Sequence, residues 1–370
     1  MAVVKNLVQP FQTLSVVKST SPPNYHRAGC GPGAGRRLPR AVRLSDAREY
    51  RPGMSTLLVY GSYGYTGRLV VERALEGLAD DHDLVLGGRS PSKLEPQADE
   101  HDLPSRAFTL DHQRVVERHL EDVDVVLNCA GPFARTADPF VDACVETGTD
   151  YLDITGEIGV FEALAARDAE AAGVAVLPGV GFDVVPTDCL AAHLDEALPD
   201  ATDLSLGFQA FGSFSRGTMR TAVESIGEGG AVRRDGRVTT VSAVHDTREV
   251  DFGNGETLAV TVPWGDVATA YHSTGVPNVR VYTAVPERAV RALEATDSLA
   301  PLLDREWVQR TLAAVVDRTV EGPDAEEREE GAVFVWGEIS DGETTYEARL
   351  RTPETYTMTA RTAVEAARRT

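Results

Sequence analysis

Residues 56–67 read Thr56-Leu57-Leu58-Val59-Tyr60-Gly61-Ser62-Tyr63-Gly64-Tyr65-Thr66-Gly67, a short apolar run that ends in three evenly spaced glycines. An amphipathic segment, residues 68–78, follows at once. A strand, a glycine turn and a helix in this order form the context of a pyrophosphate site, because glycine lets a phosphate approach the backbone and the helix N-terminus offers free N–H groups. A plain structural turn is the alternative interpretation. The predicted phosphate contacts are Gly61, Ser62, Tyr63, Gly64, Tyr65, Thr66 and Gly67.

The residues after this turn continue an alternation of short strands and helices. Further strands are predicted at residues 84–88, 107–110, 123–128, 151–152 and 174–177, and helices at residues 91–100, 137–147 and 159–172. This alternation is typical of an α/β fold with a Rossmann doubly wound parallel sheet, whose ligands lie beyond the carboxyl ends of the strands.

The pattern changes after Pro186. A helix is predicted at residues 187–197, and alternating strands at residues 204–211 and 279–283. Two Asp-Gly pairs, Asp235-Gly236 and Asp341-Gly342, are typical of hairpin turns between strands. These features predict a second α+β domain with a mixed, largely antiparallel sheet, suited to substrate binding and dimerisation, and a closing amphipathic helix at residues 353–369.

The segment after the second strand indicates which dinucleotide is bound. An NAD site usually has an Asp or Glu about 20 residues after the glycines. Here the sequence is Gly88-Arg89-Ser90-Pro91-Ser92-Lys93, with two cations, two hydroxyls and no acid. A guanidinium pairs with a 2′-phosphate, whereas a carboxylate repels it. We therefore predict NADP as the cofactor, bound by Arg89, Ser90 and Lys93; a solvated helix start is the alternative, most evenly balanced for Lys93.

Small residues follow the fourth strand, in Asn128-Cys129-Ala130-Gly131-Pro132. They suit close approach of the nicotinamide ribose, so Asn128, Ala130, Gly131 and Pro132 are predicted cofactor contacts. Cys129 has no histidine nearby in the sequence to activate it, and we interpret it as a small hydrophobic residue rather than a nucleophile.

Composition limits the function classes. The 370 residues, 42% of them hydrophobic, suffice for two domains, and the absence of a run of 18 apolar residues predicts no membrane span. The four cysteines include no C-x-x-C pair, so neither a disulfide scaffold nor a metal site is predicted. A reduced, cytoplasmic location is the default expectation.

The net charge of −21 divides unevenly along the chain. Residues 1–53 hold nine Lys or Arg and two Asp or Glu, whereas the remainder holds 27 basic and 55 acidic residues. A body this acidic repels phosphodiester backbones, so no nucleic-acid partner is expected. Lys5, Lys18 and Lys93 are the only lysines, a pattern expected of a halophilic protein or of a GC-rich genome.

Residues 1–53 lack a sustained helical or strand period, and their middle is rich in glycine and proline. We expect either a disordered extension or a mis-annotated sequence upstream of a true start at Met54; an ordered arm is the alternative. No apolar run of the length of a signal peptide follows Arg36-Arg37.

Taken together, these motifs resemble the saccharopine dehydrogenase-like oxidoreductases, most closely the trans-acting enoyl reductase branch. The resemblance spans residues 54–370. Beyond the glycine turn, residues 88–90 and residues 128–133, it rests on residues 149–157, 181–188, 215–218, 263–266, 273–278 and 335–338.

The resemblance implies an NADP-binding Rossmann domain at residues 54–185, a substrate and dimerisation domain at residues 186–350, and a C-terminal helix at residues 351–370 that returns to the Rossmann domain. It also implies hydride transfer, with saccharopine not implied as the substrate. The family pattern includes a short Thr-Pro-containing tail that these residues do not contain, and activity is expected to suffer if that tail closes the site.

Two residues are the leading candidates for proton handling. Asp183 follows the sixth strand, beside the expected nicotinamide position, and His272, in the predicted loop at residues 271–278, is a histidine, the residue type most often used for proton transfer. A helix N-cap is the alternative role for Asp183, and a structural role is the alternative for His272. Further candidates for a proton donor are Asp153, Glu157 and Tyr271. Ser215, Thr218 or loop amides could stabilise an enolate oxygen.

The leading hypothesis is an NADP-dependent oxidoreductase that reduces an enoyl or carbonyl group of a lipid-like or prenyl substrate. The competing hypothesis is a non-catalytic NADP-binding scaffold or redox-sensing protein. The expected partners are a small-molecule substrate, which a lipid would satisfy, and a second copy of the chain in a homodimer.

Overall fold

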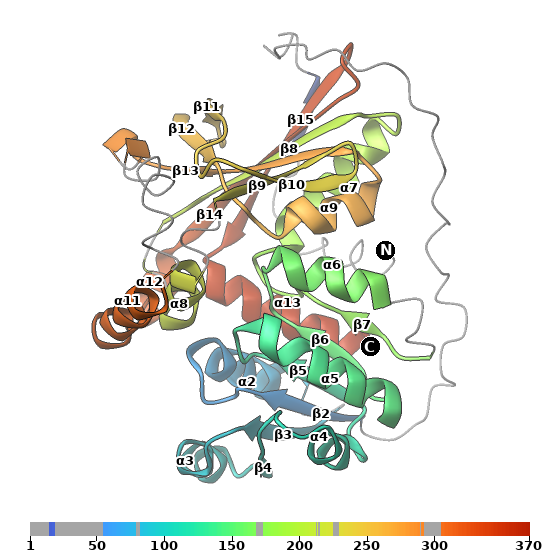
Figure 1. Cartoon of the computed structure of the whole chain (residues 1–370), viewed down its shortest axis with the longest axis vertical. Coiled ribbons are helices and arrows are strands. Elements are labelled where there is room, and N and C mark those ends of the chain that lie inside the picture. The colour runs from blue at the N-terminus through green and yellow to red at the C-terminus, as the bar shows by residue number, and fades with distance from the viewer. Residues whose placement is uncertain are drawn as a thin grey trace.

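The computed structural model describes residues 15–18, 55–78, 82–167, 173–211, 213, 215–224, 229–288, 290–291 and 305–370. The described strands form two sheets, of six and nine strands, which lie one above the other in Figure 1. No helix among these residues has both the length and the apolar character needed to cross a bilayer.

The six-stranded sheet is parallel throughout, in the order β4-β3-β2-β5-β6-β7. Its strands are β2 (Ser55–Tyr60), β3 (His82–Gly88), β4 (Ser105–Ala107), β5 (Val125–Asn128), β6 (Asp150–Asp153) and β7 (Val176–Leu177). The helices between them are α2 (Tyr65–Gly77), α3 (Pro91–His101), α4 (Gln113–Leu120), α5 (Phe133–Thr147) and α6 (Ile158–Arg167). The strand order reverses between β2 and β5, which places the ligand crevice at their carboxyl ends. The predicted Rossmann sheet is confirmed.

Side chains of β2 alternate between two cores. Leu57 and Val59 are fully buried with apolar residues of α2, α3 and the last helix, α13 (Thr355–Arg369). Leu58 and Tyr60 face α4 and α5 on the other side of the sheet. Helices therefore cover both faces, which explains why the central strands are continuously apolar.

The third strand of this sheet lies earlier than predicted. Residues 107–110 were expected to form it, whereas β4 covers Ser105–Ala107 and pairs with residues 86–88 of β3. Phe108 is apolar because it leaves the strand and packs under the sheet, 5.0 Å from the ring of Tyr60 between centroids. Phe108 is therefore apolar because it is a buried loop residue, and not because it belongs to a strand.

The second sheet has the order β1-β15-β14-β8-β13-β12-β11, with the β9–β10 hairpin joined through β13. Only β8 and β13 pair in parallel among its described strands, so the predicted mixed, largely antiparallel sheet is confirmed. Its strands are β1 (Ser15–Lys18), β8 (Asp203–Ala210), β9 (Gly230–Arg234), β10 (Arg237–Val241), β11 (Thr247–Asp251), β12 (Glu256–Thr261), β13 (Asn278–Ala284), β14 (Ala332–Ser340) and β15 (Thr345–Pro353).

Helices α7 (Val185–Ala197) and α9 (Asp266–Thr274) cover one face of this sheet. Three further helices are α8 (Arg216–Glu224), α11 (Glu306–Thr319) and α12 (Ala325–Glu330). Asp235-Gly236 joins β9 to β10 with positive φ at both residues, and Asp341-Gly342 lies between β14 and β15. Both predicted hairpin turns are confirmed, and positive φ is the reason that the first needs Asp-Gly.

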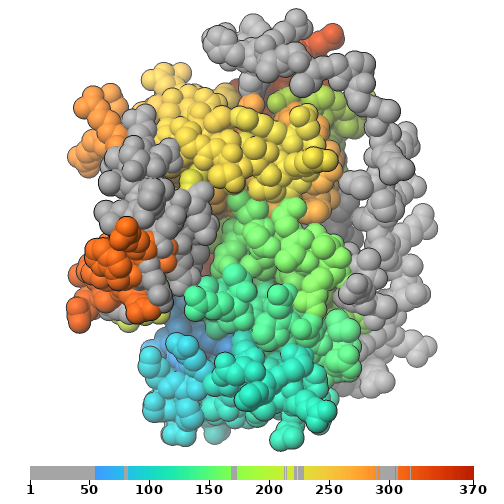
Figure 2. All heavy atoms as spheres, in the orientation of Figure 1, coloured from blue at the N-terminus to red at the C-terminus, as the bar shows by residue number. Residues whose placement is uncertain are grey.

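Helix α13 links the two sheets, because it starts directly after β15 and runs back to the first domain. Its residues Ala363, Val364 and Ala367 share one apolar core with Val70 and Ala74 of α2. The junction has a second link, since Arg233 of β9 forms an ion pair with Glu162 of α6. Figure 2 shows the green residues of α6 directly against yellow residues of the second domain.

Within residues 1–53 the structure describes β1 alone, which pairs antiparallel with residues 346–349. The other residues of that segment, and Met54, lie outside the described residues. The expectations of a disordered extension and of a start at Met54 therefore stay predictions.

Candidate functional site

The glycine turn between β2 and α2 is shaped by close backbone contacts. Gly61 has φ of 83°, and its N–H and that of Ser62 donate to the carbonyl oxygen of Gly87 at 2.8 and 3.2 Å. A Cβ on Gly67 would lie 2.2 Å from the carbonyl oxygen of Gly61, which excludes any side chain there. Because the Arg68 N–H makes the first helical bond, to Gly64, the three N–H groups before it lack partners within the helix. They offer an anion site at the N-terminus of α2.

Ser62 supports the same interpretation. Its side chain is fully buried, and its hydroxyl has no hydrogen-bond partner among the described residues. Gln97 of α3 donates to the Ser62 carbonyl oxygen at 3.0 Å and so fixes the backbone of the turn. A buried hydroxyl without a partner is costly unless a ligand satisfies it, so the turn fits a bound dinucleotide.

The predicted 2′-phosphate residues gather around Tyr63. The Tyr63 ring lies so close to Gly88 that a Cβ there would be 2.4 Å from the ring. The Tyr63 hydroxyl accepts a hydrogen bond from the Ser90 N–H at 3.2 Å, and the Lys93 ammonium lies 5.9 Å from the centroid of the Tyr63 ring. Arg89 is exposed at the end of β3, and among the described residues no carboxylate pairs with it. The structure thus brings Tyr63, Arg89, Ser90 and Lys93 to one edge of the turn.

The side chain of Asn128 forms hydrogen bonds within the protein and does not face solvent. It is fully buried, its oxygen accepts from the Ala130 N–H at 3.0 Å, and its amide donates to Thr136 at 3.0 Å and Tyr151 at 3.3 Å. Ala130 in turn lies against Gly61, because a Cβ added to Gly61 would be 3.0 Å from the Cβ of Ala130. Asn128 therefore shapes the loop that carries Ala130, Gly131 and Pro132.

Two acids considered at the end of β6 have structural partners. Glu157 accepts from the N–H groups of Phe133 and Ala134 at 2.7 and 2.8 Å, so it caps α5. Asp153 is fully buried and accepts from the Tyr151 hydroxyl at 2.8 Å, and burial raises the pKa of Asp153 to about 6. Neither carboxylate is free to reach a ligand without losing these bonds.

Cys129 agrees with its interpretation as a hydrophobic residue. Burial raises the pKa of its thiol to about 12, and the nearby Asp153 adds to the shift. A thiol held in this form is a poor nucleophile at neutral pH.

Asp183 lies at the junction of the two domains, just before α7. Its surroundings raise the pKa of the carboxyl group to about 6 by desolvation, although the side chain keeps partial exposure. A Cβ on Gly156 would lie 2.8 Å from Asp183 Oδ2, so the carboxyl group rests against that backbone. The N-cap of α7 is Val184, without a capping side chain, so the N-cap alternative for Asp183 is wrong.

His272 lies elsewhere. It was expected in a loop, whereas it belongs to the last turn of α9, which ends in a left-handed Gly275. Its Nε2 is 3.6 Å from Glu162 Oε1 of α6, and 44% of the side chain is exposed. The structure pairs His272 with α6 and does not bring it together with Asp183.

A cluster of hydroxyl groups from both domains meets the glycine turn. The rings of Tyr65 and Tyr356 meet edge to face, with centroids 5.0 Å apart. The Tyr65 hydroxyl donates to the Pro323 carbonyl oxygen at 2.5 Å and accepts from Arg328 at 3.2 Å. The second domain therefore contacts the first residue of α2 directly.

Tyr356 completes this cluster and was not among the predicted site residues. It is 5% exposed, and its hydroxyl oxygen accepts from the Ser215 N–H at 2.5 Å and lies 2.9 Å from Thr218 Oγ1. Ser215 and Thr218 are themselves 3.1 Å apart, hydroxyl to hydroxyl. Sequence gives no local signal for Tyr356, because its partners lie more than 130 positions away.

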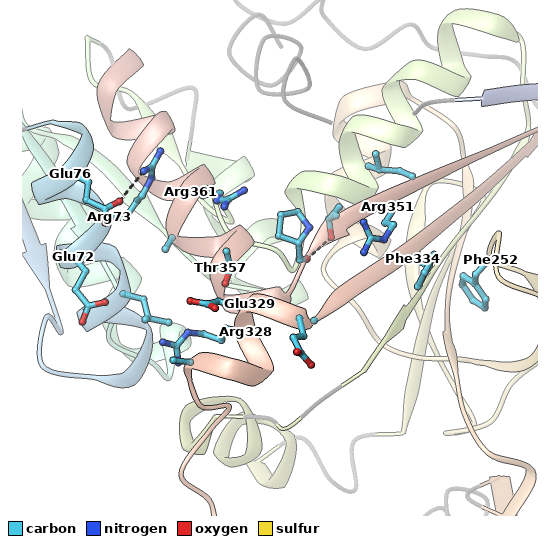
Figure 3. A pocket seen from close by; sticks show the side chains of 18 of the residues that line it. Glu72, Arg73, Glu76, Phe252, Arg328, Glu329, Phe334, Arg351, Thr357 and Arg361 are labelled. Carbon is cyan, nitrogen blue, oxygen red and sulfur yellow. Dashed lines mark hydrogen bonds and ion pairs between the residues drawn. The ribbon is translucent and has the colours of Figure 1, made fainter. Parts of the chain in front are cut away.

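A cavity of about 1030 Å³ lies between α2, α12, α13 and β15 (Figure 3). None of the predicted site residues lines it. Arg73, Arg328 and Arg361 lie around it with Glu72 and Glu329, so its walls carry both charges. In the described part of the chain, no group of three or more His, Cys, Asp or Glu side chains is arranged to hold a metal ion.

Known proteins share sequence similarity with the part of the chain that carries this site. Residues 57–177 match the family model of the saccharopine dehydrogenase NADP binding domain. A probable mitochondrial saccharopine dehydrogenase-like oxidoreductase of Arabidopsis thaliana is 33% identical over 148 residues, which cover 36% of this chain and 33% of the relative. A trans-acting enoyl reductase of Mycobacterium leprae is 32% identical over 153 residues, covering 39% and 35%. The chain thus spans about a third of the length of these two relatives.

A mouse saccharopine dehydrogenase-like oxidoreductase matches over 213 residues at 28% identity, covering 51% of this chain and 49% of the relative. Among solved structures, apo saccharopine dehydrogenase (L-Glu forming) from Saccharomyces cerevisiae superposes with a TM-score of 0.56 at 14% identity, over 85% of this chain and 90% of that one. The likeness extends the shared fold to both domains. The predicted resemblance to the saccharopine dehydrogenase-like oxidoreductases is therefore confirmed over residues 57–177, which match the family model of that nucleotide-binding domain.

Proposed function

We propose that the protein is an NADP(H)-dependent oxidoreductase that reduces an enoyl or carbonyl group of a lipid-like or prenyl substrate. The observation that carries the choice of coenzyme is the cationic end of β3, where Arg89 has no carboxylate partner among the described residues and Lys93 stands over Tyr63. The enoyl type is supported by the similarity to an enoyl reductase over part of the chain.

The chain's own residues would divide the work as follows. The first turn of α2 and the Ser62 hydroxyl would hold the pyrophosphate, and Arg89, Ser90 and Lys93 the 2′-phosphate. Ala130, Gly131 and Pro132 would border the nicotinamide ribose. The coenzyme, when bound, supplies the hydride. Asp183, whose pKa is raised to about 6, would give the proton that completes the reduction and regain one from water.

Two further proposals accompany this function. The acidic composition supports a halophilic protein in a reducing cytoplasm. The second sheet is proposed as the dimer-forming part of a homodimer. His272 is kept as a secondary candidate for proton handling, although its pairing with Glu162 favours a structural role.

The test is a pair of measurements on the purified full chain in concentrated KCl. Calorimetry with NADPH and NADH should show tighter binding of NADPH. NADPH oxidation should then follow addition of dodecenal, with dodecanal or dodecenol as the product that separates enoyl from carbonyl reduction. NADPH binding without oxidation of dodecenal or citral would favour the non-catalytic scaffold, and no binding of either coenzyme would contradict both functions.

A further inference from the structure

The cavity in Figure 3 carries different charges on its two sides. The side formed by β15 and α13 has three bases and no acid among the described residues that line it: Arg349, Arg351 and Arg361. The side formed by α2 and α12 has four acids and two bases: Glu72, Glu76, Glu329 and Glu330, with Arg73 and Arg328. A ligand bound here meets a cationic surface on one side and a mainly anionic surface on the other.

Some of these charges are already compensated within the protein. Arg73 pairs with Glu76 at 3.1 Å, and Arg349 pairs with Glu347 at 3.0 Å. Arg328 donates to two oxygens, at 2.9 and 3.2 Å, and is thereby held at the start of α2. These side chains shape the walls and reach a ligand only by losing the bonds that they have.

Arg351 and Arg361 have no such partner. Both residues are exposed, and among the described residues no carboxylate pairs with either of them. The guanidinium carbon of Arg351 lies 6.0 Å from the centroid of the Phe334 ring, so the cation stands over an aromatic surface. In a chain with 57 acidic and 36 basic residues, two such groups on one wall form a local surface for an anion.

Glu72 and Glu329 are the counterparts of these arginines. Figure 3 shows Glu72 on α2 and Glu329 on α12, on the side of the cavity away from Arg351. Both glutamates are exposed, and neither forms an ion pair with a described residue. Free carboxylates and free guanidinium groups therefore line one space without pairing with each other. A ligand that carries a cation and an anion can pair with both sides at once.

The size and the apolar lining of the cavity indicate the rest of the ligand. Its volume of about 1030 Å³ is at the upper end of the range of small-molecule sites, about 300–1,000 Å³. Leu69, Phe334 and Pro353 line it beside the charged groups and are only partly buried. An apolar arm on the ligand would cover these side chains and remove them from water.

We propose that this cavity binds a zwitterionic amphiphile. Its anionic group meets Arg351 and Arg361, its cationic nitrogen meets Glu72 and Glu329, and its apolar arm lies along Phe334. The inference goes beyond the proposed function, because none of the residues predicted for the coenzyme or for proton handling lines the cavity. Binding at this second site requires neither coenzyme nor turnover.

The test is equilibrium dialysis of the full chain against three hexyl compounds in about 0.5 M KCl, where charges in contact still attract. Hexylphosphocholine is the zwitterion, hexyl phosphate the anion and hexyltrimethylammonium the cation. Because the three probes share one apolar arm, differences between them report on charge. We expect the dissociation constant of hexylphosphocholine to be at least about tenfold lower than those of the other two.

Variants assign this preference to the two sides of the cavity. The double variant Arg351→Gln/Arg361→Gln should raise the dissociation constant of hexylphosphocholine at least about tenfold and leave that of hexyltrimethylammonium the same or lower. The matched control is Arg114→Gln, which removes an exposed arginine of α4 outside the cavity and should change neither value. Thermal melts of each variant show whether the fold is intact.

The second double variant, Glu72→Gln/Glu329→Gln, gives the reciprocal result and carries the test if the arginine variant fails to fold. It should weaken binding of hexylphosphocholine and strengthen that of hexyl phosphate. The inference is overturned by equal affinities for the three probes, by an unchanged affinity for hexylphosphocholine in a folded double variant, or by no saturable binding of that probe up to about 10 mM. Since no readout uses NADPH, failure of the proposed reductase leaves this inference standing, and the reverse also holds.

Discussion

At the scale of single residues, Arg89 is conspicuous because it is an exposed cation without a carboxylate partner in an acidic protein. Residues 54–370 hold about two acids for every base, and several described arginines, among them Arg73, Arg167 and Arg368, form ion pairs with acids. Arg89 instead lies exposed directly after a buried strand, where its guanidinium is open to a ligand. We propose this position as the site of the 2′-phosphate of NADP.

Arg89→Asp tests this assignment. We expect the dissociation constant of NADPH to rise about thirtyfold or more, equivalent to at least about 2 kcal/mol, because a charge-assisted bond is replaced by repulsion. Affinity for NADH should hold or improve. Arg114→Asp is the matched control, since it makes the same charge change on an exposed position of α4. An unchanged ratio of the two affinities in calorimetry would contradict the assignment.

Asp183→Asn separates catalysis from stability. The pKa of Asp183 rises from 3.8 to about 6 on folding, so the folded protein binds more protons between these pH values, and the free energy of unfolding falls as the pH rises through them. The amide introduced by Asp183→Asn does not titrate and so removes that loss. We expect the free energy of unfolding to rise by about 1 kcal/mol at pH 8, after allowance for partial exposure, and to stay the same near pH 4. Activity should fall, with loss of its pH dependence near 6.

The measurement for Asp183→Asn is urea unfolding at the two pH values beside kcat over the same range. Equal stability changes at both pH values would show that the carboxyl group does not titrate as described. Retained activity with an unchanged pH profile would remove Asp183 from the mechanism.

At the scale of elements, the start of α2 is where sequence reasoning worked best. The glycine pattern is local, and its physical cause is local too, since Gly67 is forced by the carbonyl oxygen of Gly61 six residues earlier. The strand of residues 107–110 was misplaced because burial of Phe108 looks the same in a loop as in a strand. Tyr356 was missed because its contacts with Tyr65, Ser215 and Thr218 form only when helix α13 packs near α2 and α8.

Two glycines of α2 give a matched prediction. Gly67→Ala should cost more than about 2 kcal/mol and abolish NADPH binding, because its Cβ would lie 2.2 Å from a backbone oxygen. The Cβ added by Gly77→Ala, in the same helix, would meet only Val364 Cγ1 outside that helix, at 4.0 Å. The free energy of unfolding should therefore stay the same or rise by up to about 1 kcal/mol. Thermal melts with and without NADPH would decide, and comparable losses in both variants would contradict the steric argument.

At the scale of the whole molecule, the sequence was informative about architecture and uninformative about how the two domains meet. Alternation of strands and helices predicts the sheet, yet nothing local reveals that Asp183 rests against Gly156 while His272 turns toward Glu162. These contacts depend on the packing of whole helices. Residue types alone could therefore suggest Asp183 and His272 equally.

Charge also acts at this scale. With 55 acidic and 27 basic residues after residue 53, self-repulsion should destabilise the fold at low ionic strength. We expect the melting temperature to rise between about 0.1 M and about 2 M KCl, most steeply at the lower end where screening changes fastest. A melting temperature that falls or stays constant between about 0.1 M and about 1 M would contradict a halophilic character.

The packing of α13 onto α2 also has a consequence for biosynthesis. Translation delivers the glycine turn well before Ala363, Val364 and Ala367, which are made only after strands β8 to β15 of the second sheet. We therefore expect the apolar flank of α2 to stay uncovered on the nascent first domain, and accessible to chaperones, until α13 has been synthesised.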